Sequence, residues 1–164
     1  MDQVEVVYLA GGCFWGLEEL FKHEQGVTET KVGYCGGSND NPTYEYHPGH
    51  AETVAVYYDP NKTSLDKLLD FFFRVHDPTT LNRQGNDKGS SYRSAIFYTN
   101  ESELKIAQSI IDKVNASGLY KDPVVTSLEK YKQFFLAEDY HQDYLEKHPG
   151  GYTCHYLRTD ASFI

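Results

Sequence analysis

The chain has 164 residues, a formal net charge of -9 at pH 7 and an isoelectric point of about 5.1. This length suits one domain with a sizeable hydrophobic core. We therefore expect residues 1–164 to form a single domain that ends in a tail over residues 150–164. The acidic balance excludes a nucleic-acid partner and electrostatic binding to an anionic membrane, because both need clustered lysine and arginine side chains.

The N-terminal residues and the cysteines bear on the compartment. The chain starts Met1-Asp2-Gln3, without a basic segment or a long apolar run, so we expect neither a signal peptide nor a membrane-spanning helix. The 3 cysteines, at positions 13, 35 and 154, are an odd number without C-x-x-C spacing, which fits neither a secreted disulfide scaffold nor a zinc site. We expect a cytoplasmic protein without a bound metal, in which distant cysteines remain available for redox chemistry.

The N-terminal segment predicts a strand, a glycine turn and a helix. An apolar run over residues 4–10 precedes Gly11-Gly12, and apolar residues at helical spacing start at Phe14. Cys13 then lies at the helix N-terminus, where unpaired backbone N–H groups lower a thiol pKa. The glycines beside it would let a substrate approach the backbone closely. The alternative is a small buried cysteine without chemistry.

The middle of the chain predicts strands over residues 27–34, 53–58 and 93–98. Two amphipathic helices start at capping boxes, Thr63-x-x-Asp66 and Asn100-x-x-Glu103, and end at Asp77-Pro78 and at Gly118. A short strand over 124–128 and a helix over 138–147 complete the prediction.

The order of these elements, βαββαβ, predicts an α/β two-layer sandwich with a ferredoxin-like core, added C-terminal helices and a mobile tail. In this topology the first two strands end, and the next two begin, at one edge of the sheet. Cys13 and the loops over 35–51 and 77–91 therefore share that edge. Both loops are longer than the usual ~4–6 residues, which favours a functional role over mere exposure.

Side chains suited to acid catalysis and to binding of an oxyanion follow at that edge. Glu52 lies at the mouth of the strand predicted over 53–58, where partial burial would raise its pKa and make it a general acid. Tyr44 and Tyr92 could donate their hydroxyls to an oxyanion, and Asp87 could accept hydrogen bonds or order water. The alternatives are a solvated edge glutamate, packing tyrosines and a turn aspartate. Phe14 and Trp15 would place an apolar wall beside Cys13.

The two other cysteines differ in position. Cys154 lies in a glycine-hinged tail, from which it could swing to Cys13 and resolve an oxidised sulfur. Cys35 precedes Gly36-Gly37, and we expect it to be an inert buried cysteine.

The motif Gly12-Cys13-Phe14-Trp15-Gly16 resembles the signature of the peptide methionine sulfoxide reductase A family. The resemblance runs in order from residue 8 to about residue 156. It is carried further by Gly33-Tyr34-Cys35-Gly36-Gly37, Asn41-Pro42-Thr43-Tyr44, Gly49-His50-Ala51-Glu52, Asp77-Pro78-Thr79, Gln84-Gly85-Asn86-Asp87, Tyr92-Arg93-Ser94-Ala95-Ile96 and Ala137-Glu138-Asp139-Tyr140-His141-Gln142-x-Tyr144-Leu145.

The resemblance implies a reaction and assigns roles to these residues. Cys13 would attack the sulfur of a methionine S-sulfoxide, free or in oxidised proteins and peptides, and become a sulfenic acid. Cys154 would then form a disulfide that thioredoxin reduces. The other implied roles are an S-methyl pocket at Phe14 and Trp15, protonation and binding of the oxygen by Glu52, Tyr44 and Tyr92, and water ordering by Asp87. No cofactor is implied, and a monomer is expected.

This chain departs from the family pattern at two places. The loop Glu45-Tyr46-His47-Pro48 is shorter than in many members, which affects the rim of the peptide-binding surface. The tail has one cysteine after residue 150 where some members use two, so recycling would proceed through one disulfide, with a part for Cys35 left open.

Three other functions remain as alternatives. Cys13 could act with His50 or His141 as a cysteine hydrolase, which would need no reductant. The aromatic surface could bind peptides without catalysis. The thiol could also sense peroxide without reducing methionine sulfoxide.

Overall fold

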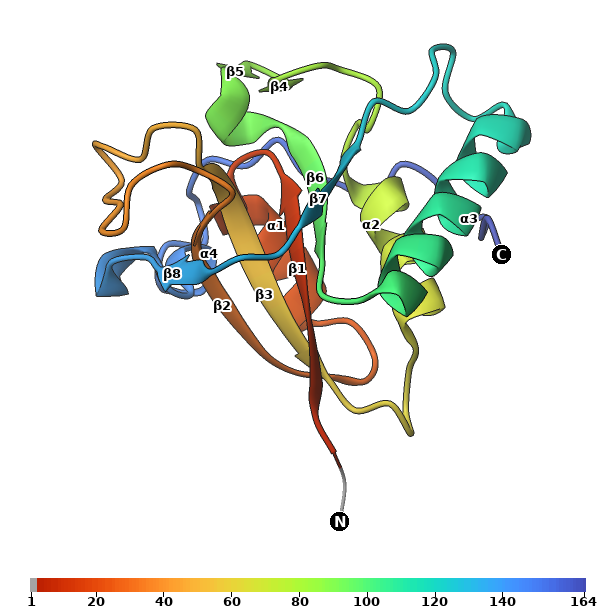
Figure 1. The fold of residues 1–164 in the computed structure, drawn as a ribbon, viewed down its shortest axis with the longest axis horizontal. Helices are drawn as coiled ribbons and strands as arrows, with labels where there is room; N and C mark the ends of the chain where they lie inside the picture. The colour runs from red at the N-terminus through yellow and green to blue at the C-terminus, as the bar shows by residue number, and fades with distance from the viewer. Residues whose placement is uncertain (1–2) are drawn as a thin grey trace.

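The computed structural model describes residues 3–164 and contains a six-stranded sheet in the order β7-β6-β1-β3-β2-β8 (Figure 1). The strands of this sheet are β1 (Glu5–Gly11), β2 (Val27–Cys35), β3 (Ala51–Tyr58), β6 (Ser94–Tyr98), β7 (Ser127–Lys130) and β8 (Phe134–Leu136). The strands β4 (Arg83–Gln84) and β5 (Asp87–Lys88) form a separate hairpin.

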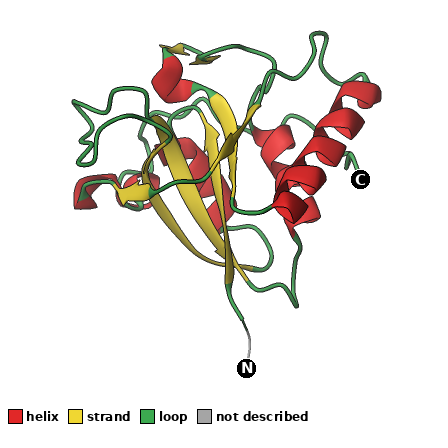
Figure 2. Ribbon diagram, viewed as in Figure 1, coloured by secondary structure: helices red, strands yellow, loops and turns green. Residues whose placement is uncertain are grey.

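The central strands have the predicted ferredoxin-like topology. β1 pairs antiparallel with β3 and β6, and β2 pairs antiparallel with β3. The helix α1 (Phe14–Lys22) connects β1 to β2, and α2 (Leu65–Val75) follows β3 (Figure 2). The predicted α/β sandwich is therefore confirmed. β7 pairs parallel with β6 and begins at Ser127. This is three residues after the start of the strand that we predicted over 124–128.

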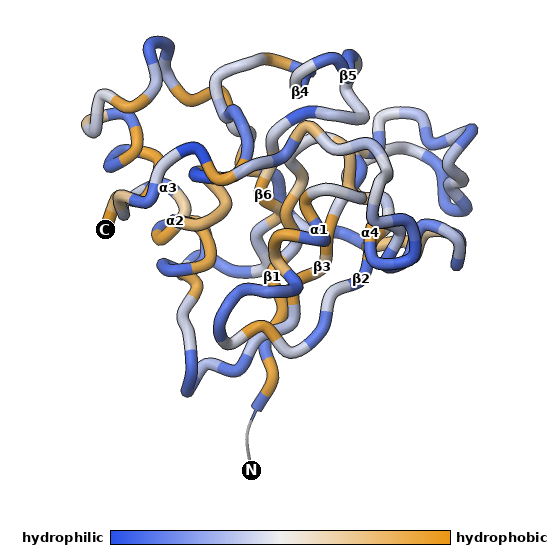
Figure 3. Tube along the Cα trace, turned by 180° about the vertical axis from the view of Figure 1, so that it is seen from behind, coloured by the Kyte–Doolittle hydropathy of each residue, from blue (hydrophilic) through white to orange (hydrophobic). Residues whose placement is uncertain are grey.

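The two faces of the sheet have different cores. In β1, Val7 and Leu9 pack in the main core with α1 and α2, whereas Ala10 packs on the other face with Phe97. The segment from Tyr131 to Phe134 covers this second, smaller cluster. Figure 3 shows the hydrophobic residues gathered along β1, β3 and β6, with hydrophilic loops around them.

The expected edge of the sheet is formed as predicted. Gly11 at the end of β1 pairs with Ser94 at the start of β6, and Cys35 at the end of β2 pairs with Ala51 at the start of β3. The β4–β5 hairpin, at the top of Figure 1, and the β2–β3 loop, at its upper left, both lie at this edge. They lie there together with the start of α1.

The C-terminal part differs from the helix that we predicted over residues 138–147. It contains the 3₁₀ helix η2 (Asp139–His141) and the short helix α4 (Tyr144–Lys147). Asp143 between them has a φ of 55°, and its N–H donates to Glu18 Oε1 at 2.8 Å. The helix is interrupted because this backbone N–H bonds to a side chain on α1 instead of continuing the helical pattern. The helix α3 (Glu101–Ser117) starts at the predicted cap Asn100 and ends at Gly118, whereas α2 is capped by Ser64 instead of Thr63.

The tail over residues 150–164 also differs from the mobile segment that we predicted. It has no helix or strand, yet it is held along its length. Arg158 N–H donates to Arg74 O at 2.7 Å, and Phe163 N–H donates to Asp70 Oδ1 at 2.6 Å. These contacts fix the tail against α2. No helix within residues 3–164 is long and apolar enough to cross a membrane.

Candidate active site

Cys13 lies at the start of α1, where it is the N-cap residue and is 5% exposed. The preceding Gly12 has a φ of 97°, a conformation that glycine adopts without a steric penalty. A Cβ at Gly12 would lie 2.6 Å from Gln84 Cγ. We predicted that this glycine leaves room for a substrate, but its space is filled by the protein itself.

The thiol pKa of Cys13 is raised in this structure, opposite to our prediction. Burial is the main cause, and the nearby Glu52 carboxyl adds to it. The backbone N–H of Trp15 lowers the pKa, as expected at a helix start. The helix effect is therefore present, but desolvation of the thiolate outweighs it.

Glu52 is the second residue of β3 and is 1% exposed. Its Oε1 accepts the backbone N–H of Phe14 at 3.1 Å. Within residues 3–164, its Oε2 is buried without a hydrogen-bond partner. Burial raises the pKa of Glu52 to about 8, with the Phe14 N–H opposing the shift. At neutral pH the carboxyl is therefore mostly protonated and holds a proton available for donation.

Tyr44 and Tyr92 lie close enough to this carboxyl to respond to its charge. Burial raises the pKa of Tyr44 to about 12, followed by the charges of Glu52 and Cys13, while a hydrogen bond from Tyr92 lowers it. Burial also raises the pKa of Tyr92, with further effects from Glu52, Tyr44 and Asp87. The structure thus gathers the predicted acid, tyrosines and aspartate around Cys13.

Trp15 stands in an aromatic cluster. Its Nε1–H donates to His141 Nδ1 at 2.9 Å, and its ring stacks on Tyr144 at a centroid distance of 3.8 Å. Tyr44 lies 6.3 Å from the same ring in a stacked arrangement. Phe14 is fully buried and packs against the His141 ring at 5.2 Å. Trp15 is partly exposed, so it forms the side of this apolar cluster that solvent reaches.

Cys154 lies beside the β4–β5 hairpin with a free thiol. Its Sγ is 3.9 Å from Gln84 O and 4.0 Å from His155 Nδ1. Burial raises its pKa, and the nearby Asp87 adds to the shift. Asp87 in turn accepts the Tyr152 hydroxyl at 3.1 Å. The tail cysteine is therefore placed at the same edge of the sheet as Cys13.

A family model for peptide methionine sulfoxide reductase matches residues 5–162. The chain belongs to this family. It is 55% identical over 160 residues to the peptide methionine sulfoxide reductase MsrA of Nocardia farcinica, which covers 98% of this chain and 94% of the relative. The MsrA of Mycobacterium bovis is 53% identical over 158 residues, covering 96% of this chain and 87% of the relative.

Solved structures of the family share this fold. The reduced form of Mxr1 from Saccharomyces cerevisiae has a TM-score of 0.88 and 37% identity, covering 96% of this chain and 93% of that chain. Mxr1 in complex with Trx2 has a TM-score of 0.67 and 28% identity, covering 96% and 91%. An oxidised form of Mxr1 matches with a TM-score of 0.71 at 38% identity, so this structure is more similar to the reduced form.

Residues that position the site were missed at the sequence level. Glu138 Oε2 accepts the backbone N–H of Tyr44 at 3.0 Å, and its Oε1 accepts the Tyr34 hydroxyl at 2.8 Å. His47 Nε2 lies 2.8 Å from Ser91 Oγ, which ties the Tyr44 loop to the segment of Tyr92. The motif over residues 137–145 marks Glu138, His141 and Tyr144 as candidates, but it does not predict which residues Glu138 contacts.

The two histidines of the hydrolase alternative are engaged elsewhere. His50 Nδ1 accepts the Gly37 N–H at 3.0 Å, and its Nε2 donates to Asn39 O at 2.9 Å. His141 uses Nδ1 for Trp15. A base that activates Cys13 by a hydrogen bond is therefore supplied by neither ring in the arrangement described for residues 3–164.

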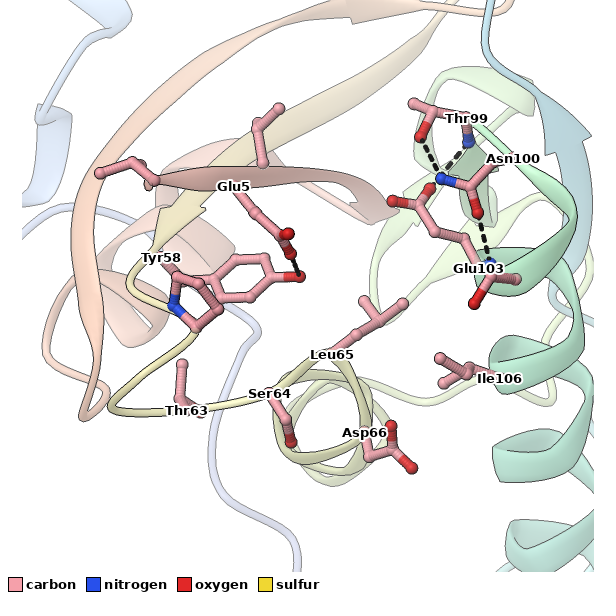
Figure 4. Close-up of a pocket in the computed structure, with 14 residues that line it drawn as sticks. Glu5, Tyr58, Thr63, Ser64, Leu65, Asp66, Thr99, Asn100, Glu103 and Ile106 are labelled. Atoms are coloured by element: carbon pink, nitrogen blue, oxygen red, sulfur yellow. Dashed lines mark hydrogen bonds between the residues drawn. The ribbon is translucent and has the colours of Figure 1, made fainter. Parts of the chain in front are cut away.

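A cavity of about 580 Å³ lies at the opposite edge of the sheet, where β1 begins and β3 ends (Figure 4). Its polar groups bond to one another: the Tyr58 hydroxyl donates to Glu5 Oε2 at 3.0 Å, and Glu103 N–H donates to Asn100 Oδ1 at 2.9 Å. Its lining contains no cysteine. We therefore assign the active site to the edge that contains Cys13 and not to this cavity.

Proposed function

We propose that this protein reduces methionine S-sulfoxide, free or within peptides and proteins, to methionine, with Cys13 as the nucleophile. The family membership supports the reaction class. The observation that carries the proposed residue roles is the pairing of Cys13 with a buried Glu52 that is protonated at neutral pH. A sulfoxide oxygen is weakly basic and needs a proton as the new bond to sulfur forms, and Glu52 is suited to supply it.

The first step would transfer the sulfoxide oxygen to Cys13. The Cys13 sulfur bonds to the sulfoxide sulfur while Glu52 protonates the oxygen, with Tyr44 and Tyr92 donating hydrogen bonds to it. The hydroxyl passes to Cys13, the sulfur–sulfur bond breaks, and methionine leaves with a lone pair on its sulfur. Glu52 takes up the Cys13 thiol proton as the sulfur–sulfur bond forms, so it ends the step protonated, and Cys13 ends it as a sulfenic acid. The sulfoxide is reduced and the cysteine is oxidised.

The S-methyl group would rest against Trp15 and the Phe14 cluster, with Asp87 ordering water nearby. The raised pKa of Cys13 in the free protein implies that its thiolate forms only as the sulfoxide enters. This order of events would spare the resting thiol from unproductive oxidation, because the thiolate is the reactive form.

The second step would use Cys154. Its thiol attacks the Cys13 sulfenic acid, the S–O bond breaks, a disulfide forms and water leaves. A cavity of about 560 Å³ that is lined by Tyr152, Cys154 and Tyr156 lies beside the tail. It would admit a thioredoxin thiolate, and the Mxr1–Trx2 complex supports this class of reductant. We place this cycle in the cytoplasm, where the free thiols of residues 13, 35 and 154 stay reduced, and in a single-domain monomer.

Separated sulfoxide epimers test the proposal. One arrangement of methyl group and oxygen around Cys13 allows attack on only one hand of the sulfur. With thioredoxin as reductant, we expect turnover of the S-sulfoxide and none of the R-sulfoxide, followed as methionine released. Equal turnover of both epimers contradicts the proposed pocket, and acyl transfer without reductant would support a hydrolase.

A further inference from the structure

The tail crosses the start of α1 at positions where glycine leaves room for it. A Cβ at Gly16 would overlap Thr153 Oγ1 and would lie 2.5 Å from His155 Nδ1. A Cβ at Gly12 would lie 3.3 Å from His155 Nε2. Gly16 also has no conformational need for glycine, since its φ is not positive and it lies within a helix. The two glycines around Cys13 thus form a seat for the tail.

His155 is the side chain that occupies this seat. It is 6% exposed, and its Nε2 donates to Gly11 O at 2.6 Å. Burial lowers the pKa of His155 to about 4, so the ring is neutral at pH 7 and has one N–H. That proton must be on Nε2, because a carbonyl oxygen can only accept. The backbone N–H of His155 donates to Thr153 Oγ1 at 3.1 Å, which fixes the turn around Cys154.

The two ends of this hydrogen bond are close in sequence to the two redox cysteines. Gly11 lies two residues before Cys13, and His155 follows Cys154 directly. Consecutive Cα atoms are about 3.8 Å apart, and a disulfide needs Cα atoms within roughly 4.4–6.8 Å. The charge of Cys154 also raises the thiol pKa of Cys13, so the two thiols lie near one another while the tail is pinned at His155. Without this bond, the segment between the hydrogen-bonded residues Gly151 and Arg158 would lose its fixed path past Cys13, and ordering it again costs conformational entropy.

We propose that His155 is a positioning residue for the resolving step, which anchors the tail on Gly11 so that Cys154 reaches the Cys13 sulfenic acid quickly. The inference rests on the proposed function, in which Cys154 resolves Cys13. It concerns only the second step, because His155 makes no contact with Glu52 or Trp15 among the hydrogen bonds described for residues 3–164. In this proposal His155 stays bonded to Gly11 while Cys154 moves toward Cys13.

The test compares His155→Phe, which fills the seat but has no donor, with His155→Gln, whose amide can place an N–H near the position of Nε2. Each full-length protein is mixed with methionine S-sulfoxide without thioredoxin. Methionine released in the first turnover reports step one, and labelling of Cys13 by a dimedone-type probe reports the lifetime of the sulfenic acid. We expect His155→Phe to leave the first turnover unchanged and to slow the loss of sulfenic acid about five- to tenfold, the effect of one net hydrogen bond. His155→Gln should restore much of the wild-type rate.

Thr153→Val provides a milder variant if His155→Phe does not fold, since it removes only the acceptor of the His155 N–H. It should lengthen the sulfenic acid lifetime in the same direction. Cys154→Ser is the control for the proposed function itself. If Cys154→Ser recycles normally, both the resolving role and this inference fail. If Cys154→Ser stalls while His155→Phe resolves as fast as wild type, or faster, only the inference is overturned. A parallel slowing of both steps would also overturn it, since that indicates a general structural defect.

Discussion

Glu52 accepts a hydrogen bond from the backbone N–H of Phe14 at 3.1 Å, while its other oxygen is buried without a partner within residues 3–164. The first contact orients the carboxyl toward the start of α1. The second oxygen is a source of instability, because an unpaired buried polar atom costs about 1–3 kcal/mol. An active site that keeps such an atom trades stability for a proton donor.

Replacement of Glu52 tests its role as the acid. Gln retains the acceptor for Phe14 N–H but cannot donate an acidic proton. We expect Glu52→Gln to slow the first turnover by roughly 10²–10⁴-fold, the usual contribution of a general acid. Asp87→Asn should have a much smaller effect. Rapid-quench measurement of methionine release at pH 7 distinguishes them, and an unchanged rate in Glu52→Gln would exclude Glu52 as the acid.

The same variant should change how stability depends on pH. Burial raises the native pKa of Glu52 to about 8 from an ordinary value of 4.5. Between these values the native state holds a proton that the unfolded state has lost, so this group makes stability fall as pH rises, by up to about 1.4 kcal/mol per unit. Below 4.5 both states are protonated, and above about 8 both are ionised.

We therefore expect Glu52→Gln to unfold at a higher temperature than wild type, with a difference that grows from pH 5 to pH 8 and then stays constant. Thermal unfolding across this range measures it. The exposed Glu45→Gln is the matched control and should show no such trend. A difference that is flat across this range would mean that Glu52 is ionised in the native protein at pH 7.

The indole of Trp15 should depend on His141 for its orientation. Trp15 is the only tryptophan, so its fluorescence reports this contact directly. His141→Leu removes the acceptor of the indole N–H, whereas His141→Asn keeps an acceptor at the position of Nδ1. We expect the Leu variant to shift the emission and to lower kcat/KM by about tenfold, because the partly buried indole N–H loses its hydrogen-bond acceptor.

His141→Asn should restore both signals, while Tyr140→Phe should alter neither, because Tyr140 is 57% exposed and keeps its ring. Wild-type emission and kcat/KM in His141→Leu would show that stacking on Tyr144 alone orients the indole.

The sequence predicts the fold well where local rules decide it. Glycine at position 118, an Asn cap at position 100 and the apolar run that forms β1 lead to the observed elements. The position of Cys13 follows from the same kind of reasoning. Its pKa does not, since the local helix effect competes with burial and with the charge of Glu52, a residue distant in sequence.

Contacts over long sequence separations account for the other differences. Trp15 and His141 are 126 positions apart, and the Asp143–Glu18 contact that interrupts the predicted helix spans 125 positions. The sequence predicts a mobile tail because chain ends move unless they are anchored and because this one follows two glycines. It is anchored by His155, which packs against Gly12 and Gly16. Because glycine has no side chain, the sequence does not indicate this contact.

Replacement of each of the three cysteines should affect a different step of the reaction. Cys13→Ser should abolish reduction, because a neutral hydroxyl is a poor nucleophile toward a sulfoxide sulfur. Cys154→Ser should release about one methionine per enzyme and then stop, since step one needs only Cys13. Cys35→Ser should turn over nearly as wild type: Cys35 is fully buried, its Sγ donates to Gln133 O at 3.2 Å, and burial raises its pKa to about 12.

Methionine release with and without thioredoxin, combined with sulfenic acid labelling, reads out all three variants. The stalled Cys154→Ser protein should be labelled at Cys13, and thioredoxin should not restart it. The opposite pattern, with fast thioredoxin-driven turnover in Cys154→Ser and a stall in Cys35→Ser, would transfer the resolving role to Cys35. That outcome would require a large opening of the sheet edge, because Cys35 packs with Phe97 and Phe134 in the small core on the other face of the sheet. The anchored position of Cys154 beside the start of α1 needs only a local change, which is why we expect the tail cysteine to resolve Cys13.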